Sequence, residues 1–370
     1  MKILHTAPLR SGGITSFVLN ITGKLNSDEY QIYNLCFRNQ TEFSEERFIK
    51  AGGIKKVIDV EGIKFKPFKM YVKYKGVYKL IKDEGIDIFH LDTDTADQVF
   101  LAKAAKKAGA KVIYHSHNSE TWRKGLIWAW INAICKHIML RYVDFYLGCS
   151  ESAAQYLFPK SIVKSHNYKV VTNGINLDKY VFNKEIRKEY REKNGLSDKF
   201  VVGHVGRFNE QKNHTFLLDI FAEILKIKEN AVLLLIGEGE LYDEVKQKAK
   251  VLGISENVVF YGKTSEVYNL MQAMDVFVFP SLFEGLPVAG VEAQAADLPF
   301  FMSDTITKEL QMTDHCVYLP LQDSKKWAET VCAESEMMVR RDTRKELRAN
   351  GYDINQTVEF LEELYKSLVS

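Results

Sequence analysis

Residues 275–299 read DVFVFPSLFEGLPVAGVEAQAADLP. The stretch opens with an apolar run of strand length, passes through a Gly-Leu-Pro turn and continues with helical spacing. A strand, a glycine turn and a helix start together form the place where α/β proteins bind phosphates. Two carboxylates, Glu284 and Glu292, flank this turn. The stretch therefore predicts a parallel α/β sheet and a site that binds more than phosphate.

Apolar runs of strand length recur along the chain, with helical stretches between them. They lie at residues 3–6, 31–36, 57–60, 86–90, 112–115, 145–148 and 170–172, and again at 201–205, 232–236, 258–261, 276–279, 300–302 and 317–319. Strands that alternate with helices form parallel sheets covered on both faces. We predict one doubly wound domain over residues 1–180, a second over 181–354, and a closing helix at about 355–370 that can pack back onto the first. The junction is expected within residues 173–199.

The bulk composition is that of a globular protein with room for two cores. The chain has 370 residues, of which 46% are hydrophobic and 26% charged. Its five cysteines form no C-x-x-C pair, which favours reduced thiols over a disulfide framework or a zinc site. The N-terminus enters a strand directly, and no apolar run approaches the roughly 20 residues of a membrane span. We expect no signal peptide and a cytoplasmic protein.

A second strand end carries two basic side chains. Arg207 follows the run at 201–205, and Lys212 comes five residues later. A guanidinium matches phosphate oxygens in shape, and a lysine supplies a mobile positive charge. We interpret the pair as a diphosphate clamp, although two solvated surface charges would give the same pattern.

The carboxylates of residues 275–299 then need not touch phosphate. Carboxylates accept hydrogen bonds from hydroxyl groups, in which sugars are rich. Pro287 suits the first turn of a helix, which leaves Glu284 in the loop and puts Glu292 on the helix. Two hydrogen-bond acceptors, one in the loop and one further along the helix, can hold a sugar and a ribose on either side of a diphosphate. The predicted ligand is a nucleotide sugar.

The first half carries three patterns near predicted strand ends. Gly12 and Gly13 form either a phosphate-binding loop or a tight turn without a ligand. His115 and His117 point the same way if the strand continues, and we interpret them as substrate contacts. Asp92-Thr93-Asp94 matches the D-x-D pattern of metal-dependent enzymes, but such matches arise often by chance. We therefore predict no metal site.

Taken in order, these segments resemble the retaining glycosyltransferases of family four, which have the GT-B fold of two Rossmann-like domains facing across a cleft. SLFEGLPVAGVEAQA resembles the E-x7-E motif of the family, and VGRFNEQKN resembles its G-R-x4-K phosphate segment. RSGGIT, VDFYLGCSESAA and VVTNGINLDKY are similar to its glycine loop, to the segment closing the first domain and to the turn before the second. EAQAADLPFFMSDTITKE resembles the branch that assembles bacterial capsules and exopolysaccharides.

The resemblance implies the site residues at matching positions. The catalytic positions would contact the reacting carbon, the donor sugar or the departing diphosphate: His117, Glu284, Arg207 and Lys212. The donor-binding positions would contact the nucleotide sugar, with Glu292 on the ribose: Gly12, Gly13, Arg207, Lys212, Gly262, Lys263, Glu284, Gly285, Leu286, Pro287, Val288 and Glu292.

The resemblance also implies a transferase that retains anomeric configuration and uses neither a metal nor another cofactor. The donor would be a nucleotide sugar, most simply a UDP-sugar, and the acceptor a glycan or lipid-linked sugar, with no nucleic acid partner. A UDP-sugar epimerase of similar fold and a non-catalytic nucleotide-sugar-binding protein stay open as alternatives. A dehydrogenase is disfavoured, because neither half has G-x-G-x-x-G after a strand with an acid about 20 residues later.

Charge is distributed unevenly along the chain. The net charge is +2, yet basic residues outnumber acidic ones in residues 1–180 and the reverse holds afterwards. Residues 63–82 interleave lysines with aromatics, and residues 122–141 add three tryptophans beside Lys and Arg. Such side chains suit a helix that lies on an anionic membrane surface, so we predict peripheral association with the inner face of the cell membrane. Aromatics packed in the core beside solvated lysines are the alternative.

Overall fold

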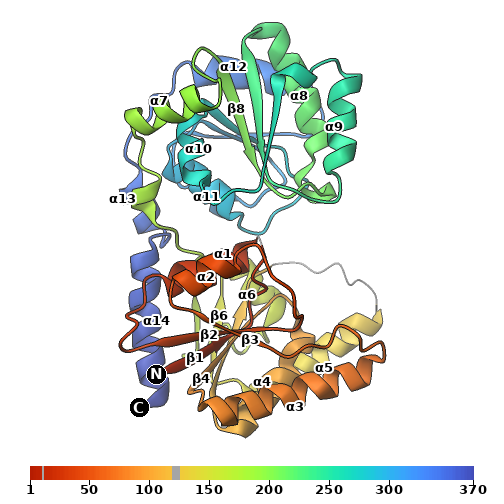
Figure 1. The fold of residues 1–370 in the computed structure, drawn as a ribbon, viewed down its shortest axis with the longest axis vertical. Coiled ribbons are helices and arrows are strands. Elements are labelled where there is room, and N and C mark those ends of the chain that lie inside the picture. Colours follow the sequence, from red (N-terminus) through yellow and green to blue (C-terminus); the bar gives the residue numbers. More distant parts are fainter. Residues whose placement is uncertain (11, 119–125) are drawn as a thin grey trace. The chain divides into compact units, whose positions relative to one another are not determined.

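The computed structural model describes residues 1–10, 12–118 and 126–370 and divides the chain into two compact units (Figure 1). Unit 1 comprises Met1–Ile175 and Gly351–Ser370, and unit 2 comprises Asn176–Asn350. The division lies inside the predicted junction but a few residues before the predicted boundary at residue 180. Ile175 belongs to unit 1 because its N–H donates to Tyr352 at 2.9 Å and its carbonyl accepts from Ile354 at 3.0 Å.

Unit 1 is built on a parallel sheet that has seven strands among the described residues, in the order β3-β2-β1-β4-β5-β6-β7. The strands are β1 (Lys2–His5), β2 (Gln31–Cys36), β3 (Ile54–Val57), β4 (Ile88–Thr93), β5 (Lys111–Ser116), β6 (Phe145–Gly148) and β7 (Tyr168–Val170). The helices are α1 (Gly13–Thr22), α2 (Glu45–Lys50), α3 (Lys66–Glu84), α4 (Val99–Ala108), α5 (Leu126–Tyr142), α6 (Glu151–Leu157) and α14 (Ile354–Val369).

Unit 2 is built on a six-stranded parallel sheet in the order β10-β9-β8-β11-β12-β13. The strands are β8 (Phe200–Val205), β9 (Ala231–Ile236), β10 (Val258–Gly262), β11 (Val276–Phe279), β12 (Phe300–Ser303) and β13 (Cys316–Leu319). The helices are α7 (Lys184–Lys193), α8 (His214–Ile227), α9 (Tyr242–Val251), α10 (Val267–Ala273), α11 (Val288–Ala295), α12 (Ser324–Ser335) and α13 (Arg344–Ala349).

The predicted strand at 86–90 is placed too early. Strand β4 runs to Thr93 because it pairs on both sides, with His5 opposite His90 and Asp92 opposite His115. Asp92 therefore lies within a buried strand and not in the loop after it. The predicted strands at 57–60 and 170–172 are instead placed too late, because β3 spans Ile54–Val57 and β7 spans Tyr168–Val170.

The sheet of unit 1 is covered on both faces by apolar helix surfaces. One core contains side chains from α3, α4 and α5 packed on the strands, including Val77, Ala104, Met139, Phe89 and Tyr114. The other contains side chains from α1 and α14, including Phe17, Leu361 and Tyr365. Helix α14 follows unit 2 in sequence, yet Figure 1 shows it alongside the strands of unit 1. Its apolar side chains recur every three to four residues, so one face is buried.

Both sheets have the strand order of doubly wound folds, in which the direction of winding reverses between two central strands. The reversal lies between β1 and β4 in unit 1 and between β8 and β11 in unit 2. Ligands of such folds bind beyond the carboxyl ends of the strands at this point. The loops that carry Gly12, Arg207 and Glu284 follow β1, β8 and β11, whereas His117 and Lys263 follow the neighbouring strands β5 and β10.

Candidate active site

Lys212 and Glu284 form a nearly buried ion pair at the carboxyl edge of unit 2. Lys212 Nζ lies 2.6 Å from Glu284 Oε1, and the two side chains are 14% and 7% exposed. Gln211 Nε2 donates to Glu284 Oε2 at 3.1 Å. The ammonium of Lys212 also lies 4.4 Å from the ring centroid of Phe279, at the end of β11. The structure therefore joins two predicted site residues into one unit and holds both carboxylate oxygens of Glu284.

Arg207 lies at the same edge but is exposed. Its Nη2 is 3.3 Å from Glu240 Oε2, with side-chain exposures of 62% and 57%. Lys263, which follows β10, pairs in the same way with Glu238 at 2.8 Å. The loop Gly237-Glu238-Gly239-Glu240 thus contacts two predicted donor-binding residues.

The sequence analysis did not predict a role for this glycine loop. Gly237 has φ of +145°, and a Cβ there would lie 2.0 Å from the carbonyl oxygen of Gly206. A Cβ on Gly239 would lie 2.3 Å from the carbonyl oxygen of Phe208. Only glycines allow the loops after β8 and β9 to approach this closely. Two glycines directly after the apolar run at 232–236 were the signal that could have identified it.

Helix α11 carries the second predicted carboxylate. Glu292 Oε1 accepts a hydrogen bond from the hydroxyl of Tyr180 at 2.5 Å. Pro287 is the N-cap of the helix, with φ of −71° and ψ of 121°, so the helix begins at Val288, one residue later than predicted. The Gly285-Leu286 turn precedes this helix start, where the first backbone N–H groups lack intrahelical partners. Tyr180 was not among the predicted site residues, because it is far from Glu292 in sequence.

His117 follows β5 in unit 1 and contacts a buried carboxylate. Its Nε2 lies 3.0 Å from Asp92 Oδ1, and the side chains are 2% and 0% exposed. The phenyl ring of Phe17, on α1, packs against His117 with a centroid distance of 5.4 Å. Gly12 and Gly13 stand at the start of α1, and Gly12 has φ of +147°, a value that favours glycine. Their neighbour Ser11 lies outside the described residues.

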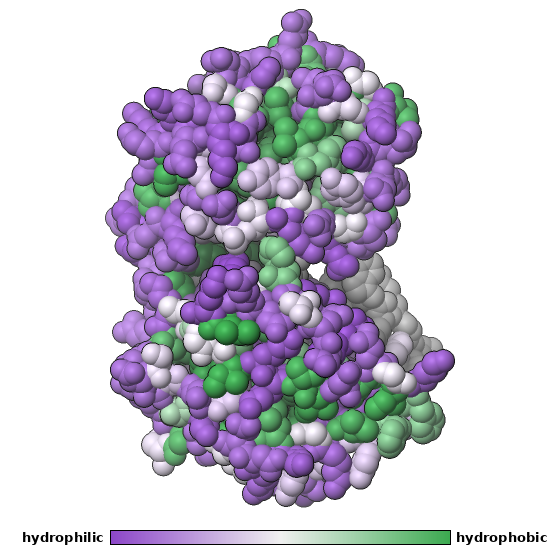
Figure 2. Space-filling model, in the orientation of Figure 1, coloured by the Kyte–Doolittle hydropathy of each residue, from purple (hydrophilic) through white to green (hydrophobic). Residues whose placement is uncertain are grey.

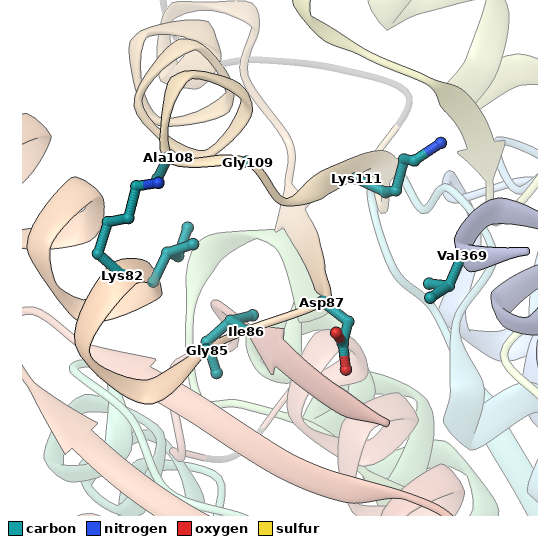
Figure 3. Close-up of a pocket in the computed structure, with 9 residues that line it drawn as sticks. Lys82, Gly85, Ile86, Asp87, Ala108, Gly109, Lys111 and Val369 are labelled. Atoms are coloured by element: carbon teal, nitrogen blue, oxygen red, sulfur yellow. The ribbon is translucent and has the colours of Figure 1, made fainter.

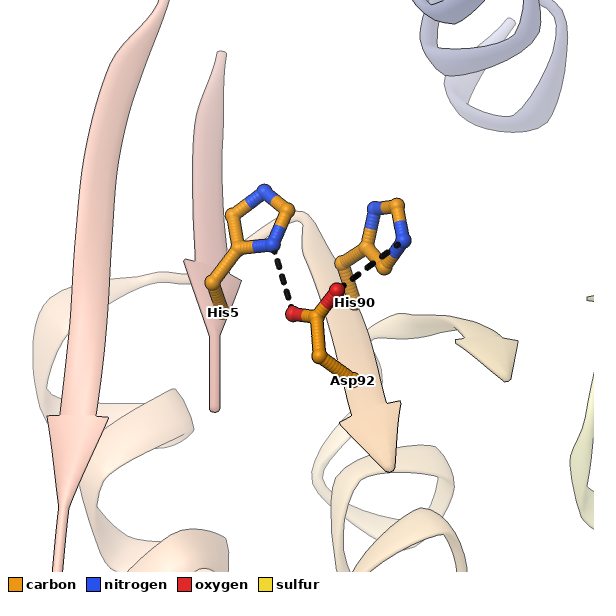
Figure 4. A group of neighbouring side chains, drawn as sticks. All are labelled: His5, His90 and Asp92. Carbon is orange, nitrogen blue, oxygen red and sulfur yellow. Dashed lines mark hydrogen bonds and ion pairs between the residues drawn. The ribbon is translucent and has the colours of Figure 1, made fainter. Parts of the chain in front are cut away.

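Asp92 is surrounded by four imidazoles. His5 Nδ1 lies 2.8 Å from Asp92 Oδ2, and both His90 Nε2 and His115 Nδ1 lie 3.8 Å from Asp92 Oδ1. Figure 4 shows the rings of His5 and His90 on either side of the carboxylate. Burial lowers the pKa of His90 to about 3 and holds that of His115 well below its ordinary value, so both rings are neutral. The predicted roles of His115 and His117 as substrate contacts did not anticipate this cluster.

The D-x-D pattern does not form a pair of carboxylates in the structure. Asp92 is buried among histidines, whereas Asp94 is exposed after the strand. Two groups of described residues place potential ligand atoms within 4.8 Å of one another, His5 with His90 and Asp92, and Asp92 with His115 and His117. Asp94 belongs to neither group.

A hollow of about 460 Å³ opens at the opposite, amino-terminal edge of the unit 1 sheet (Figure 3). Lys82, Gly85, Gly109 and Lys111 are among the residues that line it. The carboxylate of Asp87, which also lines it, accepts a hydrogen bond from the Lys2 N–H at 2.8 Å and so ties β1 to the start of β4. Because doubly wound folds bind ligands at the carboxyl edge, we assign this hollow no role in the reaction.

Comparison with known proteins identifies the family. Residues 11–179 match the family described as Glycosyltransferase Family 4, and residues 186–332 match Glycosyl transferases group 1. The chain is 32% identical to the putative glycosyltransferase EpsF of Bacillus subtilis, over 98% of this chain and 96% of EpsF. The chain belongs to glycosyltransferase family 4.

Other relatives of this family 4 glycosyltransferase act on bacterial glycans. It is 26% identical to the UDP-Gal:alpha-D-GlcNAc-diphosphoundecaprenol alpha-1,3-galactosyltransferase of Escherichia coli, over 80% of this chain and 79% of that protein. It is 24% identical to CapH, a capsular polysaccharide biosynthesis glycosyltransferase of Staphylococcus aureus, over 99% of both chains. The predicted family and its capsule branch are confirmed.

Solved structures confirm the predicted fold. The crystal structure of Anabaena HepE in complex with UDP and glucose has a TM-score of 0.78 at 16% identity, over 99% of both chains. WaaG, a glycosyltransferase of lipopolysaccharide biosynthesis, has a TM-score of 0.63 at 14% identity, over 98% of this chain and 95% of WaaG. The two parallel-sheet units are the Rossmann-like domains of the GT-B fold.

Proposed function

We propose that this glycosyltransferase moves a sugar from a UDP-sugar to a glycan or lipid-linked acceptor, with retention of configuration, in the synthesis of a bacterial capsule or exopolysaccharide. The observation that carries the proposal is the Lys212–Glu284 pair, held by Gln211 at the carboxyl edge of unit 2. A binding site for a negatively charged, hydroxyl-rich ligand needs both a cation and an oriented acceptor. HepE binds UDP, and the E. coli relative is named for a UDP-galactose donor, which supports the choice of base.

The cations are arranged to receive a diphosphate. An ammonium has three N–H donors, and Lys212 directs one toward Glu284 Oε1, which leaves donors for phosphate oxygens. Arg207 is paired with exposed Glu240, and such surface pairs contribute little to stability. The guanidinium can therefore exchange this partner for a phosphate at small cost. We assign Gly262 and Lys263 to the base, and the backbone of Gly285, Leu286 and Val288 to the sugar and diphosphate.

The carboxylates are oriented to accept sugar hydroxyls. Glu284 is fixed through both oxygens, and each oxygen keeps a second lone pair for a ligand. The hydroxyl of Tyr180 orients Glu292, and a carboxylate can accept several hydrogen bonds at once. In this proposal Glu284 lies by the donor sugar and Glu292 binds the ribose.

The same geometry favours a direct route to retention. Double displacement needs a carboxylate nucleophile at the anomeric carbon. Glu284 is a poor nucleophile, because Lys212 and Gln211 already draw on the electron density of both its oxygens. We propose substitution on one face of the sugar, in which the leaving phosphate accepts the proton of the acceptor hydroxyl. Arg207 and Lys212 stabilise the growing charge on the diphosphate, so the proposed reaction uses no metal and no cofactor.

We place the acceptor side in unit 1 and propose that it docks on an anionic membrane surface. Helix α3 exposes Phe68 (53%) and Tyr71 (55%), and α5 exposes Trp130 (74%). Figure 2 shows apolar side chains among hydrophilic ones on the surface of this unit. Trp122 and its basic neighbours, part of the predicted membrane segment, lie outside the described residues. No helix among the described residues is long and apolar enough to cross a bilayer.

A donor panel tests the proposed activity. UDP-, GDP- and ADP-sugars are compared by calorimetry and by release of the nucleotide diphosphate in EDTA. We expect binding and hydrolysis with UDP-sugars only, undiminished by EDTA, and an NMR spectrum of the transfer product with the anomeric configuration of the donor. Conversion of a UDP-sugar to its epimer in the absence of an acceptor would support the alternative, and activity that returns only with added metal would contradict metal independence.

The Glu292→Ala variant tests the ribose contact. Loss of two hydrogen bonds to a charged group, each about 1.5–3 kcal/mol, should weaken UDP binding at least a hundredfold. Tyr180→Phe is the control, because it keeps the ring and removes the hydroxyl that donates to Glu292. Its effect on UDP affinity should be severalfold at most. Wild-type affinity in Glu292→Ala would rule out this role.

A further inference from the structure

The carboxylate of Asp92 is the most deeply buried charge near a predicted catalytic residue. Burial by itself would raise its pKa, but His5, His90 and His117 hold that pKa well below the ordinary value, so the group is ionised. An ionised carboxylate can only accept hydrogen bonds. Its two oxygens are approached by two different imidazoles, His5 Nδ1 at Oδ2 and His117 Nε2 at Oδ1. Both nitrogens must therefore carry a proton.

This requirement places a proton on Nε2 of His117. In the neutral imidazole only one nitrogen has a hydrogen, so a proton on Nε2 leaves a lone pair on Nδ1. Nδ1 of His117 has no hydrogen-bond partner among the described residues, although the side chain is 2% exposed. Phe17 packs against the ring at a centroid distance of 5.4 Å and limits its rotation. The ring is held in one plane with one defined acceptor.

We propose that Asp92 is a positioning residue for sugar transfer, which fixes the ring plane and tautomer of His117 so that Nδ1 accepts a hydrogen bond from a hydroxyl group of the donor sugar. The inference rests on the proposed function, in which His117 lies near the reacting carbon. His90 is itself held within this cluster: its Nδ1 lies 2.9 Å from the hydroxyl of Tyr365 on α14, and its Nε2 lies 3.2 Å from His115 Nδ1.

A metal ion held by the same atoms is the competing interpretation. Distances of 2.8 and 3.0 Å from the carboxylate oxygens to His5 and His117 are those of hydrogen bonds. Histidines that ligate a metal usually donate their other N–H to a neighbouring acceptor. The second nitrogens of His5, His115 and His117 have no such partner among the described residues. The geometry favours the hydrogen-bonded arrangement.

Asp92→Asn is the discriminating substitution. An amide has nearly the shape of a carboxylate but offers one acceptor oxygen and one NH2 donor. It can satisfy His5 or His117 in the present tautomers, but not both. Asp94→Asn is the matched control, because it removes the same charge two residues along from an exposed side chain.

The experiment is a double-mutant cycle on release of UDP from the panel sugar that the wild type hydrolyses fastest. Asp92→Asn and His117→Ala should each lower kcat at least tenfold, and the double variant should be no slower than His117→Ala, because Asp92 acts through His117. Asp94→Asn should match the wild type in rate and Tm. A double variant whose kcat falls by the product of the two single fold-decreases would overturn the inference while leaving the proposed function intact. A wild-type rate for Asp92→Asn would do the same. A wild-type rate for His117→Ala would instead remove the catalytic role of His117.

A second measurement does not depend on activity. In the wild-type protein labelled with 15N-histidine, the His117 resonances, identified by their loss in His117→Ala, should show a proton on Nε2 and a bare Nδ1. Asp92→Asn should introduce the other tautomer. A proton on Nδ1 in the wild type would overturn the inference. One equivalent of a transition metal in the purified protein, found by mass spectrometry and lost in Asp92→Asn, would also overturn the inference.

Discussion

Lys212 and Arg207, the two cations of the proposed site, differ in how much each contributes to the stability of the fold. Lys212 is 14% exposed and neutralises a carboxylate that is 7% exposed, whereas Arg207 is 62% exposed and forms an ion pair with exposed Glu240. Removing one partner of a buried ion pair leaves an uncompensated charge, while removing an exposed cation does not. The two cations of the proposed diphosphate clamp should therefore behave differently when they are removed.

Arg207→Ala should lower kcat at least tenfold with Tm within about 1 °C of the wild type, since charge on the leaving diphosphate grows toward the transition state. Lys212→Ala should lower both kcat and Tm, with a loss of stability on the order of 3 kcal/mol. UDP release and thermal unfolding measure the two quantities. Glu240→Gln, which removes the partner of Arg207, is the control and should change neither. Equal Tm losses in Arg207→Ala and Lys212→Ala would contradict this division.

At the scale of elements, glycines decide how closely the loops of unit 2 approach. The N–H of Gly206 donates to Ile236, the N–H of Phe208 donates to Glu238, and the N–H of Gly237 donates to Gly262. These bonds join the loops after β8, β9 and β10 into one surface. Arg207 and Lys263 project from that surface, so its backbone geometry sets their separation.

Gly237→Ala should disturb this surface, because the added Cβ would lie 2.0 Å from the Gly206 carbonyl oxygen and the φ of +145° disfavours any side chain. We expect a loss of several °C in Tm and weaker UDP binding. Gly253→Ala is the matched control: φ is +70°, but nothing lies within 4 Å of the new Cβ, so only about 1 kcal/mol of backbone strain is added. Indistinguishable Tm and UDP affinity in the two variants would refute the close-approach argument.

The contact of β8 with α8 creates a dependence of stability on pH. His204, in β8, and His214, at the start of α8, have ring centroids 4.7 Å apart. Burial lowers the pKa of His204 to about 3, and burial together with His204 lowers that of His214 to about 2. The unfolded chain takes up protons on these rings near pH 6.5, whereas the folded chain does not. Their contribution is therefore complete above pH 6.5 and is lost as the pH falls toward 3.

His214→Phe should reduce this acid sensitivity. Neither ring nitrogen of His214 has a hydrogen-bond partner in the described part of the chain, and Phe208 stacks on the ring at a centroid distance of 4.1 Å, so a phenyl ring fits without losing a hydrogen bond seen there. Between pH 6.5 and 5.5 the free energy of unfolding should fall by about 1 kcal/mol less in the variant than in the wild type, because the unfolded histidine is already half protonated at pH 6.5. Urea unfolding at the two pH values measures the difference. Equal falls in both proteins would show that His214 is protonated in the folded state as well.

At the scale of the whole molecule, the sequence predicts the fold better than it predicts the site. Parallel strands buried on both faces read as continuous apolar runs, which is why β6 and β11 match their predicted bounds. The E-x7-E and G-R-x4-K spacings are local, so they identify Glu284, Glu292, Arg207 and Lys212. The ligand contacts of these residues stay predictions.

Partners that are distant in the chain carry no such local signal. Glu284 meets Lys212, and Glu292 meets Tyr180, only after the loops of unit 2 are folded. Asp92 acquires its histidines through the register of β1, β4 and β5, which periodicity does not determine. The place of α14 likewise depends on tertiary contacts, since its spacing fits either domain and contacts such as that of Tyr365 with His90 assign it to unit 1.

The proposed membrane surface is a property of unit 1 as a whole. Phe68, Tyr71, Lys75 and Lys79 are exposed on α3, at intervals close to the helical repeat. Lys73 is unsuited to a test, because its ammonium packs 3.9 Å from the ring centroid of Phe37 and burial lowers its pKa. Exposed lysines near an anionic surface each contribute about 1 kcal/mol to binding, and apolar side chains add to this attraction.

Paired Lys75→Glu and Lys79→Glu changes should therefore weaken co-sedimentation with phosphatidylglycerol vesicles at least tenfold. Wild-type binding should fall as salt screens the attraction and should be weak with neutral phosphatidylcholine vesicles. The control places the same charge reversal on unit 2, at exposed Lys246 and Lys250 of α9, which have the same spacing on a helix. That variant should bind like the wild type, because only a local surface on α3 and α5 contacts the lipid. Equal weakening by both pairs would mean that net charge alone drives binding, and equal recovery with neutral and anionic vesicles would exclude electrostatic docking.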